Sequence, residues 1–218
     1  MRGILAIVGG GASGLCAAVR AAESGRFSRV IVLERGPRVG RKLLATGNGR
    51  CNLTNRYASL KNYRSRTGSH PEFMRPALET FSVGRVLSFF EDLGIVPLEE
   101  ADGKIYPRSL QAASVLDVLR FRAEELGLEI CCDREVTGIR PTAEGFVLLT
   151  TQGKLRAERV LLAAGGAASP KLGGTDSGCR LLKELGHSIT PLLPSIVQLK
   201  TELTTIRPLT GIKVDGIV

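Results

Sequence analysis

A glycine-rich turn and a later acid are the residues whose types and spacing point most directly to chemistry. The turn reads GGGASG over residues 9–14, and Glu34 follows 20 residues after Gly14. In this pattern the first glycine permits a tight turn, the second lets a pyrophosphate approach the backbone, and the third lets a helix lie close to a sheet. A carboxylate at Glu34 is placed to accept hydrogen bonds from an adenosine ribose. We therefore predict a dinucleotide site formed by Gly9, Gly11, Ala12, Ser13, Gly14 and Glu34.

A strand, a helix and a second strand must position these residues. Residues 4–8 form an apolar run that predicts a strand, and residues 30–33 predict a second, buried strand. The alanine-rich segment between them favours a helix that stops at Gly25, and the N-terminus of that helix would face the phosphates. The alternative is an ordinary structural turn. No GxxxxGK[ST] string occurs, which disfavours a nucleoside triphosphate hydrolase.

Composition and length are those of a water-soluble globular protein. The chain has 218 residues, of which 43% are hydrophobic and 23% charged, so one or two domains are expected. Its longest apolar stretch, residues 160–168, is far shorter than the roughly 20 residues of a membrane helix. The N-terminus does not follow the plan of a signal peptide, so we expect a cytoplasmic protein without membrane contact.

The five cysteines do not indicate a disulfide framework. There is no CxxC motif, which suits a reducing compartment and argues against a disulfide reductase. Cys131 and Cys132 lie on a predicted strand, where their side chains should point to opposite faces. Cys51 follows Arg50, which could lower the pKa of a nucleophilic thiol, but a packing or cofactor-lining role is favoured.

No residue is assigned as catalytic. His70 precedes a proline at a predicted helix start, and His187 follows a predicted helix, so surface or helix-end roles are favoured for both. No cluster of histidine, cysteine or acidic residues has the spacing of a metal site. This shortage of acid–base groups fits redox chemistry in which a bound cofactor itself accepts and donates hydride.

The positive charge is concentrated in one segment. The net charge is +9, and residues 35–75 contain ten Lys or Arg residues but only one acid, Glu72. One interpretation is a solvated loop that also supplies phosphate ligands. The other is a contact surface for a polyanion such as RNA, with Tyr57, Tyr63 and Phe73 available to stack.

The order of predicted elements after Glu34 is unlike that of a nicotinamide domain. The order is βαβ, a helical insertion, a β-meander and a strand that ends at Gly165-Gly166, which is the plan of FAD domains in glutathione-reductase-like flavoproteins. The expected elements are an irregular glycine-rich loop at 36–56, helices at 71–80, 83–93, 112–126 and 177–185, a hairpin at 96–100 and 104–106, strands at 128–132, 135–139, 145–151 and 155–157, a buried strand at 160–164, and further strands at 201–218.

Three long segments resemble one family. They are GRKLLATGNGRCNLTN at residues 40–55, DGKIYPRSLQAASVLDVL at 102–119 and LLAAGGAASPKLGGTDSG at 161–178. Each is similar to a signature of the aminoacetone-oxidase-like, BaiN/RdsA group of NAD(P)/FAD-dependent oxidoreductases. The resemblance covers essentially the whole chain.

This resemblance implies an FAD domain interrupted by a second, β-rich domain. Residues 1–194 would be the FAD domain, with a helical and hairpin insertion at about 56–127, and residues 195–218 would begin the second domain. The returning segment that completes such an FAD site would be absent, which implies an N-terminal fragment that is catalytically incomplete alone.

The resemblance also implies an activity and a set of cofactor contacts. NAD(P)H would reduce FAD, and hydride would pass to an organic acceptor, by carbon–carbon double-bond reduction or a related reaction, with RNA uridine as one acceptor class. The glycine turn would wrap the pyrophosphate, Glu34 and Arg35 would face the ribose, and Val136 would offer its backbone to the adenine. The remaining implied contacts are Arg41, Lys42, Thr46, Gly47, Gly49, Cys51 and Asn52 along the ribityl chain and flavin, and Ala164, Gly165, Gly166, Gly173, Thr175 and Asp176 beneath the cofactor and near the flavin.

Overall fold

The computed structural model of the chain describes residues 3–63 and 71–194. The predicted strands at 201–218, the predicted second domain at 195–218 and His70 lie outside the described residues. The division into two domains therefore stays a prediction.

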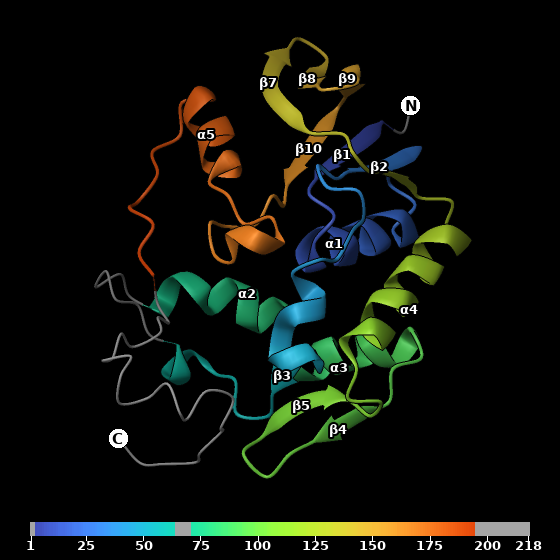
Figure 1. The fold of residues 1–218 in the computed structure, drawn as a ribbon, viewed down its shortest axis with the longest axis vertical. Helices are drawn as coiled ribbons and strands as arrows, with labels where there is room; N and C mark the ends of the chain where they lie inside the picture. Colours follow the sequence, from blue (N-terminus) through green and yellow to red (C-terminus); the bar gives the residue numbers. More distant parts are fainter. Residues whose placement is uncertain (1–2, 64–70, 195–218) are drawn as a thin grey trace, which may run out of the picture.

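A four-stranded parallel sheet forms the centre of the molecule (Figure 1). Its order is β10-β1-β2-β6, so β1 lies between β2 and β10. The glycine turn follows β1 directly, and Glu34 follows β2. The strands are β1 (Ile4–Val8), β2 (Arg29–Leu33), β6 (Glu129–Cys131) and β10 (Arg159–Leu162).

Helices cover one face of this sheet. Helix α1 (Ala12–Glu23) packs on Leu5 and Ile7 of β1, and α4 (Ala112–Glu125) packs beside α1. The buried side chains of α4 recur at helical spacing and include Val115 and Leu119, as the sequence predicts. Both helices end where glycine is expected, because Gly25 and Gly127 have positive φ.

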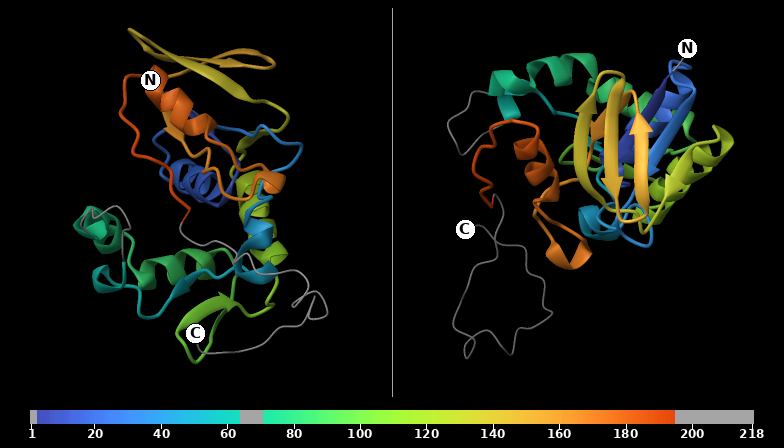
Figure 2. Two further views of the ribbon diagram at one scale, coloured as in Figure 1. Left: turned by 60° about the vertical axis from the view of Figure 1, so that its left-hand side comes forward. Right: turned by 90° about the horizontal axis from the view of Figure 1, so that it is seen from above.

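The opposite face is covered by a three-stranded antiparallel meander (Figure 2). The meander consists of β7 (Val136–Thr142), β8 (Gly145–Thr150) and β9 (Gly153–Ala157), and α5 (Ser177–Glu184) packs beside it. Side chains of alternate residues in β1, Ala6 and Val8, join its core. Cys131 belongs to this core and Cys132 to the helical one, which confirms that their side chains point to opposite faces.

The insertion forms a separate group of elements below the sheet in Figure 1. A hairpin of β4 (Pro97–Glu99) and β5 (Lys104–Pro107) is joined by β3 (Thr54–Asn55). Ser82 caps α3 (Val83–Asp92) by accepting a hydrogen bond from the Arg85 N–H at 3.5 Å. The remaining elements are α2 (Arg75–Thr80), the short 3₁₀ segments at Leu60–Asn62 and Pro71–Met74 and, outside the insertion, those at Leu43–Gly49 and Pro170–Leu172.

The predicted α/β fold with its β-meander is confirmed, and two local predictions are wrong. Residues 36–56 are not wholly irregular, because they contain 3₁₀ turns interrupted at Thr46–Asn48 and the strand β3. Strand β10 is not buried: it lies at the edge of the sheet, and Leu161 is 39% exposed. The strand is nevertheless apolar because it pairs with β1 and because the side chains on one of its faces pack against the meander.

Candidate functional site

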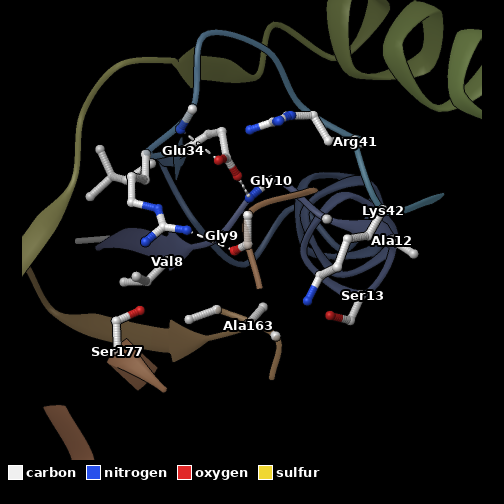
Figure 3. Close-up of a pocket in the computed structure, with 18 of the residues that line it drawn as sticks. Val8, Gly9, Gly10, Ala12, Ser13, Glu34, Arg41, Lys42, Ala163 and Ser177 are labelled. Atoms are coloured by element: carbon white, nitrogen blue, oxygen red, sulfur yellow. Dashed lines mark hydrogen bonds between the residues drawn. The ribbon is translucent and has the colours of Figure 1, made fainter. Parts of the chain in front are cut away.

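A pocket lies at the carboxyl ends of β1, β2 and β10 (Figure 3). Its volume is about 370 Å³. We call it the glycine-turn pocket, because the turn at residues 9–13 forms one wall. Segments 33–36 and 163–165 form two further walls. Ligands of open α/β sheets bind outside the carboxyl ends of the strands, so the position is that of a nucleotide site.

The three glycines of the motif have different surroundings. Gly9 has φ +111°, and an added Cβ would lie 2.4 Å from the Ala163 carbonyl oxygen. At Gly14 an added Cβ would lie 1.9 Å from the Gly9 carbonyl oxygen, so this glycine allows α1 to approach the turn. At Gly11 an added Cβ would meet no atom within 4 Å. Gly9 and Gly14 are therefore required by the fold, whereas Gly11 borders free space in the pocket.

The N-terminus of α1 contributes hydrogen-bond donors to the same wall. The first N–H groups of an α-helix have no partner within the helix, and here the first helical bond runs from the Leu15 N–H to the Gly11 carbonyl at 2.9 Å. Gly11 stands at the N-cap and has no side chain that could accept from them. No acidic residue lies in the first turn of α1. This wall can bind an anion.

Glu34 holds the rim of the pocket together. Its two carboxylate oxygens accept hydrogen bonds from the Gly10 N–H at 2.8 Å and the Gly36 N–H at 2.7 Å (Figure 3). A carboxylate offers about four acceptor positions, so Glu34 retains capacity for a ligand hydroxyl. The sequence predicted this acid but not its structural role.

Three cationic side chains connect the walls of the pocket. The loop after Glu34 carries Arg35, Arg41 and Lys42, and each donates to a backbone carbonyl of the 166–173 loop. The acceptors are Gly173 at 2.7 Å, Lys171 at 3.1 Å and Gly166 at 3.0 Å, respectively. Segments more than 120 residues apart in sequence are thereby joined beside the helix terminus.

The structure brings most of the predicted site residues together. Thirteen of them line the pocket: Gly9, Gly11, Ala12, Ser13, Glu34, Arg35, Arg41, Lys42, Thr46, Val136, Ala164, Gly165 and Gly173. Eight do not line it: Gly14, Gly47, Gly49, Cys51, Asn52, Gly166, Thr175 and Asp176.

Several lining residues were not predicted. They include Gly10, Arg38, Arg134, Glu135 and Ser177. Arg134 and Glu135 directly precede Val136, which was predicted to contact the cofactor and which begins β7, so their position beside Val136 was the available signal. Ser177 begins α5 and directly follows Asp176, a predicted contact, so its position in the 161–178 segment was the available signal.

Cys51 has the environment of a packing residue. It is buried in the core under α1 and α4, and burial raises the pKa of its thiol, although a hydrogen bond with Thr46 opposes this. Arg50 does not activate it, because its guanidinium lies over the Tyr106 ring at 4.1 Å and pairs with Glu100 at 2.7 Å. A thiol held protonated by burial is a poor nucleophile.

Several cations of the basic segment are paired within the protein. Arg56 pairs with Glu99 at 2.6 Å, and Arg75 pairs with Glu72 at 2.6 Å. Arg64 and Arg66 lie outside the described residues. Within the described ranges, no group of three or more histidine, cysteine or acidic residues could hold a metal ion. No helix in the same part of the chain has the length and apolar character to cross a membrane.

Two curated relatives share most of this chain. The 3-dehydro-bile acid delta(4,6)-reductase of Clostridium scindens is 41% identical over 212 residues, which cover 97% of this chain and 51% of the relative. The ribosomal RNA dihydrouridine synthase of Escherichia coli is 27% identical over 215 residues, covering 97% and 52%. The chain therefore spans about half the length of the curated relatives it matches.

Two solved structures share the fold at lower identity. A flavocytochrome c3 fumarate reductase in its open conformation has a TM-score of 0.59 at 17% identity, with 85% of this chain and 41% of that chain covered. The 3-ketosteroid-delta4-(5alpha)-dehydrogenase of Rhodococcus jostii RHA1 has a TM-score of 0.55 at 19% identity, covering 76% and 46%. Residues 4–217 match the HI0933-like protein Rossmann domain, which confirms the family resemblance of the three motifs, and the chain belongs to that family.

Proposed function

We propose that the glycine-turn pocket binds FAD and that this chain is the cofactor-binding part of an FAD-dependent oxidoreductase. The observation that carries the proposal is the free space at Gly11 beside the N-terminus of α1, in a pocket that also contains Glu34. A pyrophosphate fits there because nothing within 4 Å of an added Cβ occupies the approach to the backbone. The predicted cofactor fits the residues that are present.

Each wall of the pocket has a proposed task. The N–H groups of Ala12 and Ser13 would bind the pyrophosphate, and Glu34 would accept from the adenosine ribose. The Val136 backbone would contact the adenine, and Arg41 and Lys42 would lie toward the flavin. When bound, FAD would supply hydride acceptance and donation, and nearby cations would stabilise an anionic ring.

The proposed donor is NAD(P)H and the proposed acceptor is an organic molecule with a carbon–carbon double bond. The name of the 41% identical relative, a delta(4,6)-reductase, supports a reduction of this kind. These assignments concern the whole protein, because the chain spans half the length of that relative.

Flavin binding is tested by adding FAD to the purified chain and recording its visible absorbance and fluorescence. We expect quenched, protein-bound FAD in the wild type, and binding weakened about 10- to 100-fold in Gly11→Ala, whose Cβ would occupy the phosphate approach. Gly84→Ala is the matched control, since Gly84 is an exposed residue of α3 and an added Cβ meets only the Ser82 hydroxyl at 4.0 Å. Absence of FAD binding by the wild-type chain and by the full-length protein would overturn the proposal.

A second candidate is a flavoprotein that acts on RNA. Two relatives are named ribosomal RNA dihydrouridine synthase, at 27% and 28% identity. Binding through phosphates predicts an affinity for structured RNA that falls steeply as salt increases. RNA binding that is absent at low salt would remove this candidate.

A further inference from the structure

A second pocket lies in the insertion, outside the glycine-turn pocket. Its volume is about 760 Å³, and it lies between β3, the 57–63 segment, α2 and the start of α3. We call it the insertion pocket. The segment from Gly40 to Asn55 lines both pockets: Gly40–Leu43 and Thr46 line the first, and Asn52–Asn55 line the second.

One wall of the insertion pocket is an apolar helix face. Met74, Ala77, Leu78 and Phe81 line it at the i, i+3, i+4 and i+7 spacing of one helix side. Helix α2 has no buried residue, and Phe81 is 47% exposed. An apolar face that remains accessible in this way is a surface for an apolar ligand.

The opposite wall supplies aromatic rings and amides. Tyr57 and Tyr63 line the pocket and are 62% and 41% exposed. The Asn52 side chain is exposed and makes no hydrogen bond within residues 3–63 and 71–194, so its amide is available to a ligand oxygen. Rings with a few polar groups on an apolar wall are typical of small-molecule sites.

The charges of the lining residues indicate which kind of ligand the insertion pocket can bind. Among the described lining residues the only ionised side chain is Asp102, which pairs with Lys104. No Lys or Arg among those residues lines the pocket, although the surrounding segment is strongly basic. A polyanion would therefore find no counter-charge among the described lining residues, whereas an uncharged molecule requires none.

We propose that the insertion pocket binds an uncharged, ring-containing apolar molecule with a hydrogen-bonding oxygen. Its role as the site of the organic acceptor rests on the proposed function, whereas its ligand class rests on the lining alone. The 40–55 segment, which lines both pockets, would then contact cofactor and acceptor within one stretch of chain.

The test uses the tyrosines of the chain as reporters. The chain has no tryptophan and three tyrosines, of which Tyr57 and Tyr63 line the insertion pocket and Tyr106 is buried. The uncharged four-ring probe 4-androstene-3,17-dione is titrated into the chain, and tyrosine emission is recorded. We expect saturable quenching. No saturable change would overturn the proposal.

A matched pair of variants locates the binding. Ala77→Arg places a cation on the lining face of α2, and Thr80→Arg adds the same charge on α2 at an exposed position that does not line the pocket. We expect the Kd of the probe to rise at least about tenfold in Ala77→Arg, because an unpaired charge would be desolvated, and to stay unchanged in Thr80→Arg. Equal Kd values in both variants would overturn the proposal.

Two further measurements test the ligand class of the insertion pocket independently of the proposed FAD binding. FAD binding is recorded in parallel and should be unchanged in Ala77→Arg, which also shows that the variant is folded. Loss of FAD binding in the wild type would remove the proposed function while the probe titration still decides the ligand class. Polyuridylate is the second probe: if it alone quenches the tyrosines, and binds more tightly to Ala77→Arg, the pocket is a nucleic-acid contact and the proposal is wrong.

Discussion

The glycine-turn region and the insertion are built in different ways. In the first, α1 has four buried residues, including Leu15 and Val19, and the site is formed by backbone atoms whose positions are fixed by packing. In the second, α2 has no buried residue, and the insertion pocket is formed by side chains that are partly exposed. We therefore expect substitutions in the proposed cofactor site to destabilise the fold. Substitutions in the insertion pocket should alter ligand binding with little loss of stability.

The largest expected effect on stability comes from replacing a leucine with alanine in each of the two helices, α1 and α2. Leu15→Ala removes a side chain that is 0% exposed, and we expect the free energy of unfolding to fall by about 3–4 kcal/mol. Leu78→Ala in α2 should cost less than about 1 kcal/mol, because its side chain is only half-buried. Denaturant unfolding measures both values, and similar losses would break the comparison.

Two glycines of the turn, Gly14 and Gly11, give a sharper test. In Gly14→Ala the new Cβ would lie 1.9 Å from the Gly9 carbonyl oxygen, so α1 must move, and we expect about 3 kcal/mol of destabilisation. Gly11→Ala should leave the melting temperature nearly unchanged and weaken FAD binding instead. A Gly11→Ala variant that unfolds early would show that its glycine is structural.

The partly buried thiol of Cys16 makes the stability of the first region depend on pH. Burial, with a smaller contribution from Cys51, raises the pKa of Cys16 from 9.0 to about 11. The folded state holds this proton more tightly than the unfolded state, so the stabilisation is present below pH 9 and is lost as the pH rises toward 11. It amounts to about 2–3 kcal/mol.

Cys16→Ala is the control for this effect. Unfolding measured at pH 8.5, 10 and 11 should show a smaller decline in the variant than in the wild type. Parallel declines in the two proteins would mean that the Cys16 thiol is not protected by burial.

The smallest expected effect concerns the rim of the glycine-turn pocket. Glu34→Gln keeps the size of the side chain but replaces one acceptor oxygen with a donor, so either the Gly10 or the Gly36 N–H loses its partner. We expect a loss of about 1–2 kcal/mol in stability, together with weaker FAD binding. The matched change Glu144→Gln, at an exposed position outside the pocket, should alter neither quantity.

The sequence predicted the first region better than the second. Strand, turn, helix, strand and acid were all identified, because each follows from local rules: an apolar run, glycines at fixed offsets and an alanine-rich helix. In the insertion, the hairpin of β4 and β5 and the helix α3 were also predicted. These elements could be predicted because they depend on residues that are close together in the sequence.

What could not be predicted depends on contacts between distant segments. The joining of Arg35, Arg41 and Lys42 to carbonyls of residues 166–173 has no local signature. The exposure of β10 follows from its place at the sheet edge, which its apolar composition conceals. The insertion pocket likewise depends on how α2 lies against residues 52–63, and no spacing in the sequence specifies that.

The sheet order has a consequence for the sequence of events in folding. Strand β1 pairs with β10 in a register that places Leu5 beside Arg159, although these residues are 154 positions apart in the sequence. Closing so long a loop is entropically costly and slow compared with forming the adjacent β1–α1–β2 unit. During synthesis the glycine turn emerges early but lacks the wall formed by residues 163–165 until the insertion and the meander have been made. The proposed cofactor site is therefore completed only after residues 163–165 have been made, and a nascent chain would acquire affinity for its ligand only from that point of its translation onward.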